Sequence, residues 1–465
     1  MSDPLALVPL ALAARGGRVD GHGAGELVAA GITLLQRCAP LVRALDGRRA
    51  AILLPTSPAF LTALAASDGR GAVFVNPLAA PAEIAYQLAD ANAGAVFTVS
   101  ALEEKLPAGF ARVLLDDAPA HAVARIDGQE RRVDLGAHFG IDLEGAGDAA
   151  GRDEEAAIVY TSAMEGTPLG AILTHRNLLA NARATVAAAE LDASAVSLAI
   201  LPFSHLFGFT VTLMAPLLAG GRVITMARFN PPRALDVLRS EDVSLLVGVP
   251  SVFAGLLAAA EREGGRIAAP TLRVCICGGA PLEVELQERW HAATGVELRQ
   301  GYGLTEAAPV CLFNRISLPN RLGTLGVPLP GVDVAIRDGE ICVRGENVFP
   351  GYVTSGAKGL RLEDGWLRTG DRGTIDAEGY VTFTGVMKPM FTRNGFNIYP
   401  KELERVVGTM PGVQRVSVRA IPDPTRENDI ALEITGAVST EAVATWCAAR
   451  LSVYKQPTRI EISSH

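Results

Sequence analysis

The sequence is poor in aromatic residues and has no extended basic segment. Phe, Tyr and Trp make up 5% of its 465 residues, and its formal net charge is -8. A protein that holds nucleic acid through the phosphates needs clustered Lys and Arg, and here no basic run extends beyond a pair. We therefore expect no nucleic-acid partner, and any small anion must be bound by a local site.

Cysteine is scarce as well, and the residues are scattered along the chain: Cys38, Cys275, Cys277, Cys311, Cys342 and Cys447. Most of them stand in apolar, strand-like segments. This distribution indicates buried thiols in a reducing compartment rather than disulfides or a zinc site, and we expect a cytoplasmic protein.

Long apolar segments are also missing. No stretch approaches the roughly 18 residues of a membrane span without a charged residue, Pro or Gly. The N-terminal LALVPLALAA is similar to a secretory signal, but Asp3 precedes it, no basic residue does, and Pro9 interrupts it. We therefore expect neither a transmembrane span nor export.

The sequence does contain a repeated alternation of short apolar segments and helical patterns. The apolar segments are AAILLP (50–55), AVFVNP (72–77), AVFTVS (95–100) and RVLLDD (112–117), then SLAILP (197–202), GRVITM (221–226), SLLVGVP (244–250) and LRVCICGG (272–279). This alternation predicts an α/β fold with mostly parallel sheets. Residues 118–152 are polar and rich in Gly, Asp and Ala, so we expect a connecting loop there.

The pattern changes towards the C-terminus. From about Gly323, closely spaced strand-like segments with Gly turns predict an antiparallel, β-rich subdomain. After Gly385, the helical KELERVVGTM and the strand-like VQRVSVRAI and IALEITG predict a small α+β domain. We therefore divide the chain into a large N-terminal domain (1–384) and a small C-terminal domain (385–465).

The segment YTSAMEGTPLGAILTH (160–175) is similar to a phosphate-binding loop. The strand-like AAIVY leads into it and a helical run follows His175, a layout that aims backbone N–H groups at an anion. Glu165, however, stands where an anion is expected, and Leu169 stands where a cation would help.

A series of motifs follows in a recognisable order: YTSAMEGTPLG (160–170), LPFSHLFG (201–208), VPSVF (249–253), GGAPL (278–282), QGYGLTE (300–306), GEICVRGENVFPGY (339–352), DGWLRTGD (364–371) and RNGFNIYPKELE (393–404). In this order and spacing, the chain resembles the adenylate-forming (AMP-binding) superfamily, and its acyl-CoA and aryl-CoA synthetases above all. The resemblance covers nearly the whole chain. It implies an enzyme that uses ATP and Mg²⁺ to convert a small carboxylic acid to an acyl adenylate. Rotation of the small domain then lets a thiol, of coenzyme A or of phosphopantetheine, attack the adenylate.

The resemblance also implies roles for single residues. Tyr302 offers a flat face to adenine, Asp371 accepts hydrogen bonds from ribose hydroxyls, and Glu306 holds Mg²⁺ through a carboxylate oxygen. The full set implied for nucleotide binding is Thr161, Ser162, Gly166, Thr167, Gly278, Gly279, Ala280, Tyr302, Gly303, Thr305 and Asp371.

Three residues are implied as catalytic. Thr305 donates a hydrogen bond to a phosphate oxygen, His205 lies beside the acyl pocket, and Lys388 is the hinge of the small domain. A histidine among phenylalanines is also typical of a protein core, so both interpretations of His205 stay open. Gly395 is implied to line the pantetheine tunnel. The acid itself is expected to contact His205, Phe207, Phe209, Phe253 and Gly301, a set that suits an aryl or short acyl group.

The sequence departs from the family at the nucleotide. Family loops usually read TSGTTGxPKG. In this chain Ala163 replaces a glycine, Met164 and Glu165 replace two hydroxyl residues, and Leu169 replaces the lysine. A carboxylate about 4 Å from a phosphate charge costs roughly 4 kcal/mol at an effective dielectric of about 20.

Further departures lie near the C-terminus. Val386 replaces an arginine that contacts ribose, and Pro389 follows the hinge. The family's late G-K motif, whose lysine bridges carboxylate and phosphate, is not reached before His465. We therefore expect adenylation to be weak or lost.

Three functions remain open from the sequence. The first is transfer of an acyl group between coenzyme A and a second thiol, as on an acyl-carrier protein. The second is an ATP-dependent acyl-CoA or aryl-CoA ligase. The third is a binding or scaffold protein without catalysis.

Overall fold

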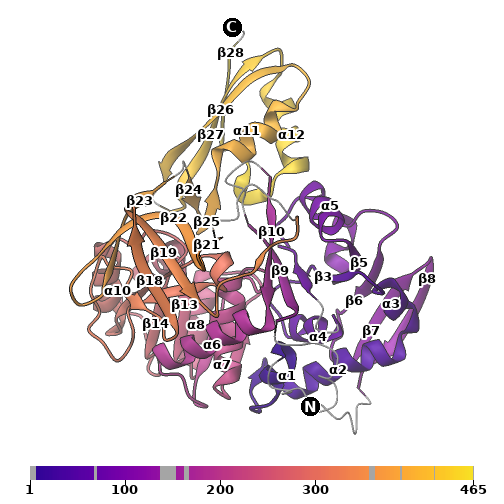
Figure 1. The fold of residues 1–465 in the computed structure, drawn as a ribbon, viewed down its shortest axis with the longest axis horizontal. Coiled ribbons are helices and arrows are strands. Elements are labelled where there is room, and N and C mark those ends of the chain that lie inside the picture. The colour runs from indigo at the N-terminus through magenta and orange to yellow at the C-terminus, as the bar shows by residue number, and fades with distance from the viewer. Residues whose placement is uncertain are drawn as a thin grey trace.

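The computed structural model describes residues 7–67, 71–136, 153–161, 167–354, 362–387, 390–423 and 425–463. Two mixed sheets with covering helices form most of the large domain, a smaller antiparallel sheet lies beside them, and the small domain sits on top (Figure 1). The α/β fold class is confirmed. Among the residues described, no helix combines the length and the hydropathy that crossing a bilayer requires.

The first large sheet carries the phosphate-loop segment at one edge. Its strands, in spatial order, are β20 (Gly351–Tyr352), β10 (Leu169–Thr174), β9 (Glu155–Thr161), β4 (Ala72–Phe74), β3 (Arg49–Ile52), β5 (Ala93–Thr98), β6 (Ala111–Leu114), β7 (His121–Ile126) and β8 (Gln129–Asp134). The predicted parallel strands β3 to β6 are confirmed. The loop predicted for 118–152 is wrong in its first part, because β7 and β8 form an antiparallel hairpin there.

The second large sheet supplies the adenine platform. Its strands, in spatial order, are β17 (Val327–Pro328), β16 (Val310–Phe313), β15 (Leu298–Gly303), β14 (Val274–Cys277), β13 (Leu245–Gly248), β11 (Val196–Ala199), β12 (Arg222–Thr225), β1 (Arg18–Val19) and β2 (His22–Gly23). The strands β11 to β15 run parallel, so their carboxyl ends meet at one edge of the sheet. Ligands of open α/β sheets bind at that edge.

Helices cover both large sheets. They are α1 (Val8–Ala13), α2 (Ala24–Arg37), α3 (Ala39–Ala44), α4 (Ala59–Ala66), α5 (Pro81–Asp90), α6 (His175–Ala188), α7 (Ala215–Leu218), α8 (Pro231–Ser240), α9 (Pro250–Glu261) and α10 (Val284–Thr294), with 3₁₀ turns η2 (Ser100–Lys105) and η5 (Thr305–Ala307) and the π-helix η4 (Phe207–Met214). Every residue of α4 is buried. It packs closely on α2, where a β-carbon at Gly31 would lie 2.7 Å from that of Ala65.

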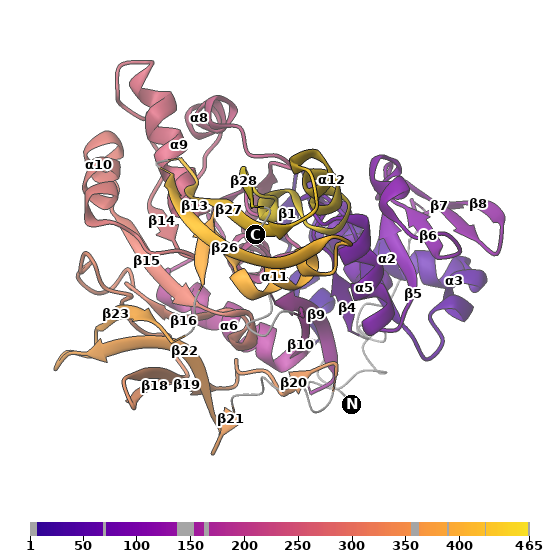
Figure 2. The same ribbon diagram turned by 90° about the horizontal axis from the view of Figure 1, so that it is seen from above.

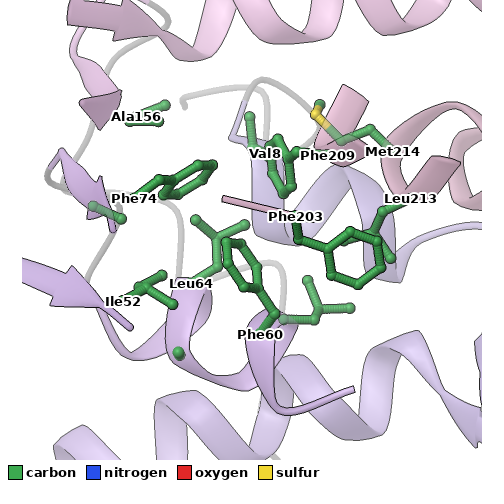
Figure 3. Close-up of a cluster of buried hydrophobic side chains, with 14 of the residues drawn as sticks. Val8, Ile52, Phe60, Leu64, Phe74, Ala156, Phe203, Phe209, Leu213 and Met214 are labelled. Atoms are coloured by element: carbon green, nitrogen blue, oxygen red, sulfur yellow. The ribbon is translucent and has the colours of Figure 1, made fainter. Parts of the chain in front are cut away.

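An aromatic cluster fills the core between the two sheets (Figure 3). Phe60 lies edge-on to Phe74, with 5.0 Å between ring centroids, and to Phe203, with 5.7 Å. Phe209 of η4 lies edge-on to Phe74 at 5.0 Å. Burying large rings in this way contributes to the hydrophobic stabilisation of a core that is otherwise mostly aliphatic.

The antiparallel subdomain predicted after Gly323 is present. It contains β18 (Val332–Arg337), β19 (Glu340–Gly345), β21 (Leu362–Glu363), β22 (Trp366–Ile375) and β23 (Val381–Val386). Strand β23 stays paired to its end, since Val386 is the partner of Asp371. The large domain therefore continues beyond residue 384, and the small domain's first strand begins only at Phe391.

The small domain has the helices and strands expected from its sequence. They are β24 (Phe391–Arg393), β25 (Phe396–Ile398), α11 (Pro400–Gly408), β26 (Val413–Asp423), β27 (Glu427–Gly436), α12 (Thr440–Arg450), the 3₁₀ turn η6 (Val453–Lys455) and β28 (Arg459–Ser463). Seen from above, α11 and β26 lie over the middle of the large domain and α12 lies beside α5 (Figure 2). The β24–β25 hairpin points down into the large domain (Figure 1).

Candidate active site

A cavity of about 1220 Å³ lies between the carboxyl edges of the two large sheets and the small domain. Most of the predicted site residues line it: Thr161, Thr167, His205, Phe207, Gly278, Gly279, Ala280, Gly301, Tyr302, Gly303, Thr305, Glu306, Asp371 and Gly395. The sequence motifs therefore converge on a single space, although they come from segments spread over more than half of the chain.

The adenine side is built from the ends of β14 and β15. Gly279, which follows β14, has φ of +79°. A β-carbon at Gly278 would lie 2.9 Å from the carbonyl oxygen of Gly301, so these backbones approach too closely for side chains. The hydroxyl of Tyr302 donates to Asp371 Oδ2 at 2.7 Å. This bond joins the two residues implied to hold adenine and ribose, and burial raises the pKa of Tyr302, which keeps it a donor.

Glu306 lies in η5 beside β20, the edge strand of the first sheet. Its Oε1 accepts a hydrogen bond from the hydroxyl of Tyr352 at 2.8 Å. Within the described ranges, no group of His, Cys, Asp and Glu is large enough to bind a metal alone. Glu306 is a carboxylate of the kind that Mg²⁺ prefers and would hold the ion if phosphate oxygens and water supplied its other ligands.

His205 is exposed to the cavity. Its Nδ1 accepts a hydrogen bond from the backbone N–H of Phe207 at 3.2 Å, which leaves Nε2 as the protonated ring nitrogen. Burial by the surrounding protein lowers the pKa of His205 to about 4. The ring is therefore a neutral donor at pH 7 and is suited to bind a carbonyl or carboxylate oxygen, which favours the acyl-site interpretation over a core residue.

The segment similar to a phosphate-binding loop is not followed directly by a helix, although its sequence predicts one. Strands β9 and β10 form an antiparallel hairpin, so β10 separates the loop from α6 by about 20 Å of extended chain. The first turn of α6 is also capped by its own residues, since Thr174 and Asn177 exchange side-chain and backbone hydrogen bonds. The strand–loop–helix layout that would aim the N-terminus of α6 at an anion is therefore wrong.

Carboxylates dominate the charge of the cavity wall. They are Glu83, Asp90, Glu283, Glu306 and Asp371. In the described part of the wall, Lys455 is the single Lys or Arg, and it is bound between Glu83 and Glu402. Leu169, where the family carries lysine, lines the same space. Nothing described here offsets the charge of a triphosphate.

The small domain contributes the tip of the β24–β25 hairpin. Asn394 and Gly395 form its two-residue turn with φ of 52° and 74°, the positive values that Asn-Gly turns adopt. A β-carbon at Gly395 would lie 2.7 Å from Cβ of Val249, at the start of α9. The next residue, Phe396, lies edge-on to His205 with 6.4 Å between ring centroids. The hairpin tip therefore lies beside His205, the residue that the family resemblance implies to flank the acyl pocket.

Some predicted contacts are not at the cavity. Phe209 packs in the aromatic core, and Phe253 lies edge-on to Trp290 at 4.9 Å; both are fully buried and neither contributes to the cavity wall. The sequence could not separate pocket from core phenylalanines, because both stand in apolar helical segments. Ser162, Gly166 and Lys388 lie outside the described residues.

Sequence reasoning missed the group around Asp90. Its carboxylate accepts from the hydroxyl of Tyr160 at 2.7 Å and from that of Thr354 at 3.1 Å. It also missed the role of Lys455, although a lysine directly after Tyr454 and two residues before Pro457 would be a signal for a positioned cation. Both groups join segments far apart in the sequence, which no local pattern reveals.

Comparison with known proteins agrees with this geometry. The AMP-binding enzyme family matches residues 41–353. This chain belongs to the AMP-binding enzymes. Feruloyl-CoA synthase from Amycolatopsis sp is 31% identical over 440 residues, covering 90% of this chain and 85% of that protein. A long-chain-fatty-acid–CoA ligase from Bacillus subtilis is 28% identical, with coverage of 89% and 82%. The AMP-binding enzyme is therefore a member of the acyl-CoA synthetase and ligase group.

Two solved structures compare with this AMP-binding enzyme over nearly its full length. A malonyl-CoA ligase in a ternary product complex with methylmalonyl-CoA and AMP has 28% identity, a TM-score of 0.82, and covers 99% of both chains. ATP-bound MatB from Rhodopseudomonas palustris has 26% identity and a TM-score of 0.64, covering 96% of this chain and 91% of that one.

Proposed function

We propose that this protein joins a small carboxylic acid with an uncharged body to the thiol of coenzyme A through an acyl adenylate. In the first step, a carboxylate oxygen bonds to the α-phosphorus of ATP and pyrophosphate leaves. In the second step, the thiol sulfur bonds to the acyl carbon, the bond to AMP breaks, and the thiol proton passes to solvent. Mg²⁺ bound at Glu306 would neutralise phosphate charge in the first step.

The observation that carries this proposal is the hairpin tip at the acyl end of the cavity. Gly395 lies against Val249, and Phe396 faces His205. If the acyl group binds beside His205, the small domain would lie next to the carbon that a thiol must attack. The higher TM-score with a structure that holds a CoA product than with one that holds ATP supports the same arrangement. A full-length overlay is better when the two domains have the same relative orientation.

The acid is inferred to be uncharged beyond its carboxylate. The side chains nearest Gly301 are apolar: a β-carbon there would lie 3.6 Å from Ile276 and 3.8 Å from Phe313, and the one polar neighbour at that distance is the uncharged backbone carbonyl of Leu312. No arginine lines the described part of the cavity. A second carboxylate on the substrate would then be desolvated without a partner, which is expensive. This favours aryl or aliphatic monocarboxylates over dicarboxylates such as methylmalonate.

We also infer that ATP is bound weakly. The triphosphate meets the carboxylate of Asp90, and Leu169 offers no charge to it. AMP, with a single phosphate, meets less of this repulsion. Adenylation should therefore be slow compared with the thiol-dependent step.

The same acidic phosphate end favours a second candidate, transfer between two thiols. A thioester is already activated, so the incoming sulfur bonds to the acyl carbon and the coenzyme A thiolate leaves and takes up a proton. Such a reaction needs the hairpin and His205 but no triphosphate site. The acceptor thiol would belong to phosphopantetheine on a carrier protein.

One experiment separates these functions. The protein is incubated with coenzyme A and ferulate, hexanoate or methylmalonate, with and without ATP and Mg²⁺, and thioester formation is followed by mass spectrometry. We expect slow ATP-dependent thioesters of ferulate or hexanoate and none of methylmalonate. If no acid forms a thioester with ATP, while feruloyl-CoA or hexanoyl-CoA acylates free pantetheine without it, the second candidate replaces the first. If neither occurs, both are wrong.

A further inference from the structure

A buried ionic cluster joins the small domain to the large domain at the rim of the cavity. Lys455 of η6 pairs with Glu83 of α5 at 2.9 Å and with Glu402 of α11 at 2.6 Å. The hydroxyl of Ser452 also donates to Glu83. Lys455 and Glu402 are only 4% and 3% exposed. One carboxylate of the large domain therefore receives two donors from the small domain, in a place largely shielded from water.

Lys455 keeps its charge in the folded protein. Burial disfavours the charge of Lys455, but the negative groups around it, Glu402 and Glu83 among them, raise its pKa above its ordinary value. Burial raises the pKa of Glu402, and Lys455 opposes that effect. Removing one partner from a buried pair leaves the other charge without compensation, which is strongly unfavourable. The pair therefore favours the docked orientation of the small domain over any orientation that separates Lys455 from Glu83.

The segment that carries Lys455 also holds the hairpin at the cavity. Arg393, at the end of β24, donates to the carbonyl oxygens of Tyr454 at 3.1 Å and Gln456 at 2.7 Å. The ring of Tyr454 stacks on Phe396, with 4.1 Å between centroids and 17° between planes. Phe396 in turn faces His205. A contact made at Glu83 is thus connected, through residues 452–456, to the hairpin tip.

We infer that Lys455 and Glu83 are positioning residues for the thiol-dependent step. Their ion pair fixes the small domain in the orientation that places the hairpin tip against Val249 and beside His205. Neither residue needs to touch the reacting atoms. The catalytic part of this inference rests on the proposed function, whereas the docking part does not.

The docking part is tested with spin labels at two exposed positions, Arg132→Cys on β8 and Ala444→Cys on α12, and electron–electron distance measurements. Glu83→Lys replaces the attraction to Lys455 with repulsion and should produce a new, longer distance. The charge-matched control Glu104→Lys, on the exposed surface of the same domain, should keep the distance of the unmodified protein. An unchanged distance in Glu83→Lys would overturn the inference.

The catalytic part is tested with Glu83→Gln. Glutamine keeps the side-chain cap that Glu83 gives to the backbone N–H of Ala80, so α5 should stay folded. The assay follows the reverse of the thiol-dependent step, in which an acyl-CoA and AMP give an acyl adenylate and free coenzyme A. We expect this reaction to slow about tenfold, because an ionic hydrogen bond becomes a neutral one. ATP–pyrophosphate exchange should not slow. The matched control is Glu402→Gln, which weakens the other ion pair of Lys455, the one within the small domain.

The outcomes separate this inference from the proposed function. Slowing of the thiol-dependent step in Glu83→Gln, but not in Glu402→Gln, supports the positioning role. Equal slowing in both variants, or slowing of pyrophosphate exchange as well, shows a general structural effect and overturns it. If the unmodified protein makes no thioester but Glu83→Lys lengthens the label distance, the docking role stands and the proposed function fails.

Discussion

Replacing Gly395 with alanine tests whether the hairpin tip must lie against the large domain. The added β-carbon would be 2.7 Å from Cβ and 2.9 Å from Cγ2 of Val249, and closer still to Cγ1. Ordinary carbon–carbon contacts are about 3.5 to 4.0 Å, so the tip must retreat by about 1 Å. Gly395 also has φ of +74°, where a side chain costs about 1 to 2 kcal/mol.

The displaced hairpin tip should change the rate of the thiol-dependent step and leave the affinity for AMP unchanged. A displacement of about 1 Å in a group that places the reacting atoms can cost about 10²-fold in rate. We therefore expect the release of coenzyme A from an acyl-CoA and AMP to slow about 10²-fold in Gly395→Ala. AMP binding should be unchanged, because Tyr302 and Asp371 belong to the large domain and do not depend on the tip.

The assay combines stopped-flow detection of the released thiol with calorimetry for AMP. Gly379→Ala is the matched control: Gly379 has φ of +86° and open space around it, so alanine there carries the backbone strain without the contact. Adding Val249→Gly to Gly395→Ala should restore part of the rate. A Gly395→Ala variant that keeps the full rate would refute the role given to the hairpin tip.

Three further predictions follow from the site. Leu169→Lys should strengthen ATP binding by about 1.5 to 3 kcal/mol and leave AMP binding almost unchanged, because the new cation meets only the triphosphate. Calorimetry measures both affinities, with Leu169→Gln as the uncharged control. Equal gains for both nucleotides would contradict the prediction. Folded His205 resists protonation until about pH 4, whereas an unfolded histidine binds a proton near 6.5, so stability should fall as the pH drops through this window. His205→Gln should therefore flatten the decrease in melting temperature between about pH 6.5 and 4, and a parallel decrease in both proteins would rule this out. Tyr302→Phe removes the hydrogen bond to Asp371 and should lower the free energy of unfolding by about 1.5 to 3 kcal/mol in urea denaturation; no change would show that this bond is not stabilising.

The parts of the fold that the sequence predicts well are those with a strong local pattern. β3, β4, β5 and β6 are short apolar segments bounded by turn residues, and the structure has strands at each. The β7–β8 hairpin was missed because alternating residues such as those of HAVARI and QERRVD expose polar side chains on one face. β10 was missed for a different reason: its apolar AILT runs directly into α6, and the boundary between them is set by the cap at Thr174.

The candidate active site likewise has features that the sequence predicts and features that it does not. Some backbone features require glycine and can therefore be predicted from the sequence. Examples are the approach of Gly278 to Gly301 and the turn at Gly395. Which phenylalanine faces the cavity is decided by packing between distant elements, so Phe207 and Phe209 could not be distinguished. The pairing of Lys455 with Glu83 spans most of the chain, and only the folded structure brings the two together.

The position of Glu83 links docking to the charge of the cavity. In the docked orientation, Lys455 and Ser452 both contact its carboxylate, so its charge is compensated. If the small domain moves away, Lys455 retains Glu402 within its own domain, and Glu83 is left as an uncompensated carboxylate on the cavity wall. The cavity therefore becomes more negative when it opens and less negative when it closes. Because ATP carries more negative charge than AMP, the extra carboxylate of the open form should weaken the binding of ATP more than that of AMP, so an open cavity repels the triphosphate most.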